Sequence, residues 1–287
     1  MRILISGAGG QLGHELRRSL SDVQLFAFDH QGLDVTDLKQ TVSTVGHVAP
    51  DLVIHAAAYT DVDGCEIDPD RAFLVNALGT RHLAIACLQH GAALAYISTD
   101  YVFDGTKGSP YLEYDEPNPI SAYGRSKLAG ERCVQILLSR HYIVRTSWLY
   151  SNTGRNFVKT ILSRSRLGKL LGVVDEVGSP TYAKDLADAL SKLVRHNAYG
   201  VYHLANEGHC SRYEYIRTIV GIAGVNAEVA PVTADEFLAE HPLPARRPRY
   251  SALRNFCAAN SLGIKLRPWQ EALAEMLQAE MGETSNG

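Results

Sequence analysis

The first half of the chain alternates short, wholly apolar runs with longer stretches whose apolar residues recur at helical spacing. The apolar runs predict five strands, over Arg2–Ser6, Gln24–Phe28, Leu52–His55, Ala93–Ser98 and Tyr142–Thr146. The stretches between them predict helices over Gln11–Leu20, Asp37–Val45 (capped by Thr36 or Asp37), Arg71–Leu88, and from Ser121 as N-cap to about Leu138. Strands that are apolar throughout and alternate with helices are typical of a parallel sheet covered on both faces. The pattern therefore predicts an α/β fold with a doubly wound parallel sheet, the Rossmann architecture.

The second half of the chain is less regular. Its pattern predicts helices over Asn156–Leu167, Lys184–Arg195, Tyr213–Ala223 and Trp269–Glu280, strands over Leu170–Val174 and Val201–Leu204, a turn at Gly178–Pro180, a Pro/Arg-rich loop at 242–249 and a frayed tail over Gly282–Gly287. We expect a dinucleotide-binding domain over residues 1–148, to which residues 170–206 return. A smaller, mostly C-terminal α/β substrate-binding domain is expected from residues 149–169 and 207–287.

Composition narrows the class of protein. Of 287 residues, 46% are hydrophobic and 21% charged, and the net charge of −3 gives no overall basic field, so we expect neither a nucleic-acid partner nor a membrane partner. No apolar run approaches a membrane span, and the N-terminal run is too short for a signal peptide, which favours a cytoplasmic protein. The five cysteines form no C-x-x-C pair and are interpreted as reduced packing residues.

A glycine-rich turn directly follows the first predicted strand and opens the first predicted helix. Its residues are Gly7, Gly9, Gly10, Gln11, Leu12 and Gly13, with glycines at positions 7, 10 and 13 giving G-x-x-G-x-x-G. A missing Cβ lets the backbone approach a pyrophosphate, and the helix start offers free N–H groups. The position of the motif favours a dinucleotide site, although a glycine turn without a ligand remains the alternative.

An acidic residue follows the second predicted strand. Asp29 can bind the adenosine ribose hydroxyls and favours NAD over NADP, because no arginine stands beside it and its neighbour is His30. A solvated turn acid is the alternative interpretation. Asp34 and Val35 lie where an adenine would sit, but the sequence cannot separate this role from a helix cap.

The residues of the expected reacting centre follow the fourth predicted strand. Tyr123 is the only one of 14 tyrosines with a lysine four places on, Lys127, so the two share one face of a helix. An ammonium beside a phenol is expected to lower the tyrosine pKa and prepare it for proton transfer. Thr99 ends the strand at the same edge of the sheet, where its hydroxyl could bind a carbonyl or only cap a turn.

Together these segments resemble the dTDP-4-dehydrorhamnose reductases, a family of extended short-chain dehydrogenases/reductases. The similar segments are G-x-x-G-Q-L-G from Gly7, A-A-A-Y-T-D-V-D from Ala56, S-T-D-Y-V-F-D-G from Ser98, Y-G-R-S-K-L-A-G-E from Tyr123, R-T-S-W-L-Y from Arg145, G-S-P-T from Gly178, and Arg247-Pro248 followed by Ser251. The likeness runs nearly from end to end and is specific.

The resemblance implies that NADPH or NADH reduces the C4 ketone of dTDP-4-dehydro-L-rhamnose to give dTDP-L-rhamnose. It implies Thr99, Tyr123 and Lys127 as catalytic residues, with Tyr123 as proton donor. Cofactor contacts would add Ala56, Ala57 and Ala58 to the glycine-rich turn, Asp29, Asp34, Val35, Tyr123 and Lys127. Substrate contacts would come from Val62, Thr99, Asp100, Tyr101, Trp148 and Arg247.

The sequence departs from some relatives, and other functions stay open. Glu15 matches a glutamate that binds Mg²⁺ between subunits in certain relatives, but Lys184 falls where a second glutamate is expected, so no metal is predicted. A monomer or a homodimer is expected. The alternatives are a reductase for another dTDP-4-keto-6-deoxy-L-hexose, a catalytically silent regulatory relative, and a 4,6-dehydratase or epimerase. Dehydratases typically follow the threonine with Asp-Glu, whereas Asp100 is followed by Tyr101.

Overall fold

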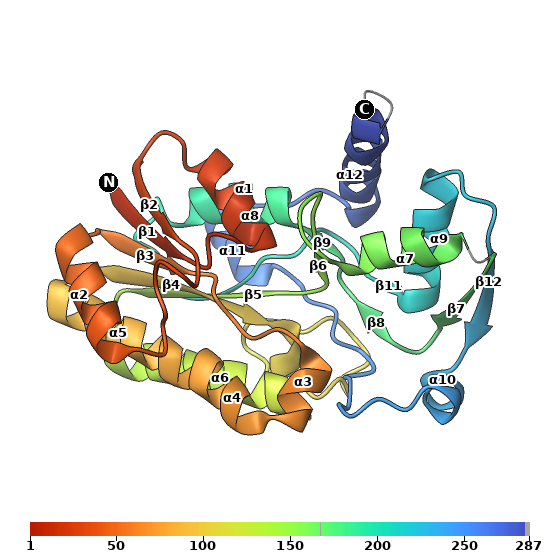
Figure 1. The fold of residues 1–287 in the computed structure, drawn as a ribbon, viewed down its shortest axis with the longest axis horizontal. Coiled ribbons are helices and arrows are strands. Elements are labelled where there is room, and N and C mark those ends of the chain that lie inside the picture. The colour runs from red at the N-terminus through yellow and green to blue at the C-terminus, as the bar shows by residue number, and fades with distance from the viewer. Residues whose placement is uncertain (167, 285–287) are drawn as a thin grey trace.

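Six parallel strands form the central sheet in the computed structural model, which describes residues 1–166 and 168–284 (Figure 1). The strands are β1 (Arg2–Ser6), β2 (Gln24–Phe28), β3 (Leu52–His55), β4 (Ala93–Thr99), β5 (His141–Thr146) and β10 (Gly200–His203). Their order across the sheet is β10-β5-β4-β3-β1-β2. All neighbours are parallel, and the five strands predicted from the first half are confirmed.

Helices cover both faces of the sheet, which confirms the predicted α/β class (Figure 1). One face packs on α1 (Gln11–Ser19), α8 (Ala183–Leu193) and α11 (Phe256–Leu262), and the other on α2 (Leu38–Val48), α5 (Thr80–His90) and α6 (Ala122–Leu137). The predicted caps at Asp37 and Ser121 are confirmed, since their side chains accept hydrogen bonds from the N–H groups of Gln40 and Gly124. Each face thus has its own apolar core.

The strand order determines where a ligand can enter. After β1 the chain goes to β2 on one side, and then returns to β3 on the other side of β1. Loops leave this switch point in opposite directions, so a crevice opens at the carboxyl ends of β1 and β3. The glycine-rich turn follows β1, and the Ala56–Ala58 segment follows β3.

A second lobe is built from three two-stranded sheets and several helices. The strand pairs are β6 (Leu149–Tyr150) with β9 (Thr181–Tyr182), β7 (Lys169–Val173) with β12 (Glu228–Val232), and β8 (Val177–Gly178) with β11 (Cys210–Ser211). The helices are α7 (Phe157–Ser165), α9 (Arg212–Ile222), α10 (Ala234–Glu240) and α12 (Trp269–Thr284). The fully buried Tyr215 lies at the centre of an aromatic core. The division of the chain into two domains at the predicted boundaries remains an interpretation.

Several elements differ from the predicted pattern. An unpredicted helix, α3 (Val62–Ile67), precedes the helix predicted over Arg71–Leu88, which is a series of α4 (Pro69–Phe73), a π-helical turn η1 (Leu74–Gly79) and α5. Helices α3 and α4 begin at Asp61 and Asp68, whose side chains cap them. The pattern also missed β12, α10 and α11, which are too short to show a period. The frayed tail predicted over Gly282–Gly287 lies in part outside the described residues, which end at Thr284 within α12.

A buried ion pair joins α6 to the sheet. The Arg145 guanidinium on β5 donates two hydrogen bonds to the Glu131 carboxylate on α6, from Nε at 3.0 Å and Nη2 at 2.7 Å. The Ser98 hydroxyl on β4 donates a third to Glu131, and both charged side chains are at most 4% exposed. The pair therefore connects three elements at the edge of the sheet where α6 carries Tyr123 and Lys127.

Within the described residues, no helix is long and apolar enough to cross a membrane.

We predict that Arg145→Leu lowers the free energy of unfolding by about 3–5 kcal/mol, because it leaves the buried Glu131 carboxylate without its partner. Urea unfolding at neutral pH measures the change. Arg195→Leu is the matched control, since Arg195 also makes two hydrogen bonds to one carboxylate, that of Asp22, but on the surface. The control should lose less than about 1 kcal/mol. Equal losses in the two variants would contradict the role of burial.

Candidate active site

A cavity of about 550 Å³ lies at the carboxyl edge of the sheet, between the sheet and the second lobe. It brings together most residues that the sequence singled out. Those that line it are Gly7, Gly9, Gly10, Gln11, Leu12, Gly13, Ala56, Ala58, Val62, Thr99, Asp100, Tyr101, Tyr123, Lys127 and Trp148. Asp29, Asp34, Val35, Ala57 and Arg247 lie outside its lining. One cavity therefore joins the glycine-rich turn to the expected reacting centre.

The glycine-rich turn fits a phosphate group. Gly7 has a φ of +81°, and a Cβ there would come within 2.5 Å of the Ala57 backbone nitrogen. Helix α1 starts after Gly10 with no side-chain cap, so its first-turn N–H groups are not occupied by a side chain. The residues of this first turn line the cavity, so they can donate to an anion.

The second lobe closes over this turn through Gln11. Its side-chain oxygen accepts hydrogen bonds from the Ser151 hydroxyl at 3.1 Å and the Asn156 amide at 3.2 Å. Asn156 caps α7 and lines the cavity, yet the sequence analysis did not select it. No local pattern reveals it, because its partner Gln11 is far away in the sequence.

The residues expected around the adenosine have clear positions but no ligand contact to test them. Asp29 is exposed at the end of β2 and accepts a hydrogen bond from the Gly32 N–H at 3.0 Å. Asp34 accepts from the Thr36 N–H and hydroxyl, and these bonds lower the pKa of its carboxyl. The Val35 side chain is buried in the core. Their cofactor roles remain predictions.

The Lys127 ammonium is buried beneath the cavity. It donates to the Ile97 carbonyl at 2.7 Å and lies 4.1 Å from the centre of the Tyr96 ring. Burial lowers the pKa of Lys127 to about 7, although the neighbouring Glu131 charge raises it. Burial therefore brings the pKa of this lysine down toward the neutral range.

The pKa of Tyr123 differs from the sequence-based expectation. Burial raises it above the ordinary value for a phenol, and the Thr99 hydroxyl beside the phenol only partly offsets this shift. The expected lowering by Lys127 is not seen, and the Lys127 ammonium donates to the Ile97 carbonyl. A raised pKa keeps Tyr123 protonated at neutral pH, which suits a proton donor rather than a base.

The carboxylate of Asp100, which directly follows β4, is hydrogen-bonded within the protein rather than free in the cavity. Its carboxylate accepts hydrogen bonds from the hydroxyls of Ser147 at 2.9 Å, Ser251 at 2.5 Å and Thr99 at 3.1 Å. Burial raises the pKa of Asp100, while these three bonds counteract the shift. Ser147 and Ser251 were present in the motifs quoted above, but their shared partner became visible only in three dimensions.

Arg247, expected to bind substrate, is engaged elsewhere. Its guanidinium donates to both carboxylate oxygens of Asp63 at 2.7 and 3.3 Å, which joins the 242–249 loop to α3.

Asn76 was missed by the sequence analysis. It is buried in the π-helical turn, and its side chain bonds both backbone groups of Tyr59 and the Ser126 hydroxyl. These contacts fix the loop after β3 against α6.

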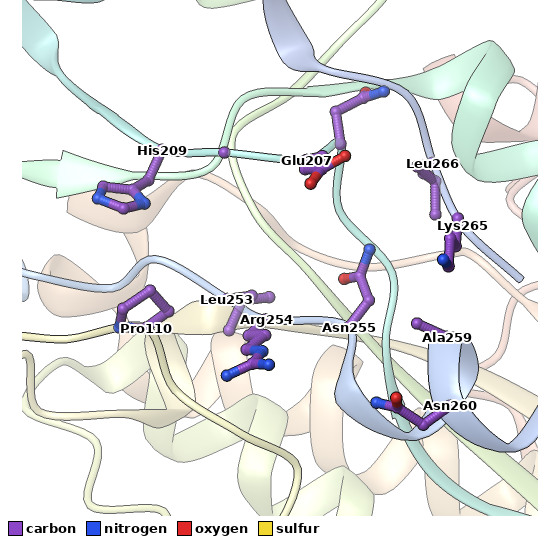
Figure 2. Close-up of a pocket in the computed structure, with 12 residues that line it drawn as sticks. Pro110, Glu207, His209, Leu253, Arg254, Asn255, Ala259, Asn260, Lys265 and Leu266 are labelled. Atoms are coloured by element: carbon purple, nitrogen blue, oxygen red, sulfur yellow. The ribbon is translucent and has the colours of Figure 1, made fainter.

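A second cavity, of about 400 Å³, lies beside the loop after β10 (Figure 2). It contains none of the residues expected to act in catalysis or cofactor binding. The two buried or half-buried amides in its wall, Asn206 and Asn255, have all their polar atoms bonded within the protein. The residues expected to act in catalysis therefore lie in the first cavity.

We predict that Lys127→Met raises the free energy of unfolding near pH 7 by about 1–3 kcal/mol, after subtraction of the lost bond to Ile97. The folded-state pKa of about 7 lies below the ordinary 10.5, so burying Lys127 costs stability that is felt fully below pH 7 and vanishes as the pH rises toward 10.5. Urea unfolding at about pH 7 and about pH 9.5 should show a smaller gain at the higher pH. Lys192→Met, at an exposed site on α8, should change little at either pH. A gain that does not depend on pH would contradict the assignment.

Comparisons with known proteins show the family to which the chain belongs. The family model described as "RmlD substrate binding domain" matches residues 1–281. The chain is 40% identical over 280 residues to the spore coat polysaccharide biosynthesis protein SpsK of Bacillus subtilis (strain 168), covering 96% of this chain and 97% of that protein. It is 41% identical over 295 residues to a dTDP-4-dehydrorhamnose reductase of Mycobacterium tuberculosis (strain ATCC 25618 / H37Rv), covering 99% and 95%.

A solved structure extends the likeness to three dimensions. The dTDP-4-dehydrorhamnose reductase of Bacillus anthracis str. Ames, in complex with NADP, is similar with a TM-score of 0.92 and 39% identity, covering 97% of this chain and 99% of that one. The matched family model spans nearly the whole chain, and the relatives are aligned over nearly their full lengths. The chain therefore belongs to the RmlD family, which is the family of the dTDP-4-dehydrorhamnose reductases.

Proposed function

We propose that the protein reduces the C4 ketone of dTDP-4-dehydro-L-rhamnose to dTDP-L-rhamnose with NADPH or NADH. Family membership makes it an NAD(P)H-dependent oxidoreductase, and the substrate is the finer part of the proposal. The observation that carries it is the single cavity in which Thr99, Tyr123 and Lys127 meet the glycine-rich turn. A dTDP-sugar is thus the expected partner. Whether the protein acts as a monomer or a homodimer, and in the cytoplasm, remains a prediction.

The residues around the turn fit the dinucleotide. The backbone of Gly10, Gln11 and Gly13 would bind its pyrophosphate, and Asp29 its adenosine ribose. When bound, the reduced nicotinamide supplies the hydride for the ketone carbon. The segment Ala56–Ala58 and Lys127 would line the nicotinamide side, since Ala56, Ala58 and Lys127 border the same cavity.

The reacting end needs a donor for the ketone oxygen. Thr99 and Tyr123 are positioned to hydrogen-bond that oxygen, and the protonated Tyr123 donates its proton as the oxygen gains charge. Lys127 would hold the nicotinamide ribose when the cofactor is bound, since its side chain borders the same cavity as Tyr123. In the structure the Thr99 hydroxyl donates its one hydrogen to Asp100, and this hydrogen would turn from Asp100 to the ketone oxygen when substrate binds. Val62, Tyr101 and Trp148 would surround the sugar.

Dehydration is a poorer fit to the same cavity. Elimination of water needs an additional acid and base free to reach the sugar. The acid at the expected place, Asp100, is bonded to three protein hydroxyls and is 1% exposed. Simple reduction needs only the proton donor that Tyr123 provides.

We predict that Tyr123→Phe lowers kcat with dTDP-4-dehydrorhamnose by about 10²–10⁴-fold, because the ketone oxygen loses its proton donor. Oxidation of NADH and NADPH, followed by absorbance, measures the rate. Cofactor affinity should stay within about threefold of the wild type, since the phenol hydroxyl is a small part of that site. Tyr114→Phe, at an exposed tyrosine, is the control and should leave kcat unchanged. Full activity of Tyr123→Phe would refute the proposed role.

We predict that Asp29→Asn raises kcat/KM for NADPH relative to NADH by about tenfold, because a carboxylate repels a 2′-phosphate and binds free ribose hydroxyls. Parallel assays with the two cofactors give the ratio. Asp22→Asn is the matched control, because Asp22 is an exposed acid just before β2 whereas Asp29 directly follows it. An unchanged ratio would place the adenosine ribose away from Asp29.

A further inference from the structure

Arg212 is a cation in the wall of the catalytic cavity that no motif of the sequence selected. It is the first residue of α9, and its side chain is 18% exposed. The guanidinium carbon lies 3.5 Å from the centre of the Trp148 ring and 4.8 Å from that of Phe157. Two aromatic rings therefore fix the direction of the guanidinium, and little rotamer freedom is left to lose when it binds a ligand.

The charge of Arg212 is only weakly compensated. Its nearest carboxylate is Glu176, with 4.0 Å between the charged atoms, and its side chain donates no hydrogen bond to any residue that the structure describes. Arg145 and Arg247, in contrast, each make two hydrogen bonds to one carboxylate. Arg212 therefore retains donors for a ligand in the cavity.

The position of Arg212 matches one part of a nucleotide sugar. The Tyr101 ring contacts the Tyr123 ring edge to face, with 5.6 Å between centroids. Tyr101 and Arg212 line the same cavity; burial raises the pKa of Tyr101, and the positive charges of Arg212 and Arg247 both counteract this shift. The cavity wall thus leads from the proton donor through Tyr101 to a cation. A sugar reduced at Tyr123 would carry its diphosphate toward that cation.

Arg212 also holds the ring of Trp148, which lines the same wall of the cavity. The Trp148 φ of 44° is unusual for a bulky residue, and such strain persists only where neighbours enforce it. The guanidinium of Arg212 covers the face of the ring, and Gly178 lies so close that a Cβ would come within 2.3 Å of Trp148 Cε2. Arg212 thus positions the ring that borders the sugar site.

We propose that Arg212 binds the diphosphate of the nucleotide-sugar substrate through its free guanidinium donors while its stacked face holds Trp148 against the sugar site. The assignment rests on the proposed function for the identity of the nucleotide, dTDP. The chemistry is general, since the planar guanidinium matches phosphate oxygens in a two-bond arrangement. Arg212 is therefore a substrate-binding and positioning residue and takes no part in proton transfer.

The test compares Arg212→Gln and Arg212→Lys with the wild type, each saturated with NADP⁺, by calorimetric titration with dTDP and with thymidine. We expect Arg212→Gln to weaken dTDP binding by about 10–100-fold and thymidine binding by less than about threefold, because only dTDP carries the diphosphate. Arg212→Lys should recover part of the dTDP affinity, since it keeps the charge and loses the flat donor pair. In the assay, Arg212→Gln should raise KM more than it lowers kcat.

Arg217→Gln is the matched control, because Arg217 lies on the same helix, is exposed, and contacts only the Tyr213 ring. It should leave dTDP affinity unchanged. A dTDP affinity within about twofold of wild type in Arg212→Gln would overturn the proposal, as would equal weakening of dTDP and thymidine, which would reduce Arg212 to a packing residue. If the wild type binds dTDP through Arg212 yet does not oxidise NADH or NADPH with dTDP-4-dehydrorhamnose, the reductase proposal fails and the diphosphate assignment stands.

Discussion

The buried pair of Glu131 and Arg145 sets the geometry on which the catalytic cavity depends. Helix α6 carries Tyr123 and Lys127, and the pair bonds the middle of that helix to β5 while Ser98 bonds it to β4. If α6 moved along the sheet, these three hydrogen bonds would break. The charged groups of Glu131 and Arg145 would then be buried without a partner. The constraint therefore fixes the distance between the catalytic helix and the strand end at Thr99.

A similar constraint orders the strand end itself. Asp100 collects hydroxyls from Thr99, Ser147 and Ser251, which lie on segments far apart in the chain. A buried carboxylate that accepts several bonds resists movement of all its donors, because each lost bond exposes an uncompensated charge to an apolar surrounding. Thr99 is held in place by this network, which takes up its one hydroxyl hydrogen.

Two kinds of contact join the two lobes: neutral hydrogen bonds and an ion pair. Neutral amides and hydroxyls, Gln11 with Ser151 and Asn156, join the lobes over the glycine-rich turn. An ion pair, Arg247 with Asp63, joins the 242–249 loop to α3 outside the lining of the cavity. The strained Trp148 and the weakly compensated Arg212 line the cavity itself, so it offers a cation whose nearest carboxylate is 4.0 Å away.

The sequence alone determined the parallel sheet, the glycine-rich turn and the shared helix face of Tyr123 and Lys127. Each of these is a local signal: wholly apolar runs mark the strands, glycines at every third position mark the turn, and a four-residue spacing puts the two side chains on one face of a helix. The nearly end-to-end likeness to a known family extended these signals to Thr99 and Trp148. Only the tertiary structure decided which charged side chains pair with other residues of the protein and which face the cavity. Arg247, expected to bind substrate, is paired with Asp63, whereas Arg212, absent from every motif, faces the cavity. It also decided the pKa shifts of Tyr123 and Lys127, since burial is the main cause of both shifts and a spacing of residues does not show burial. Partners of this kind come from distant segments, and only folding brings them together.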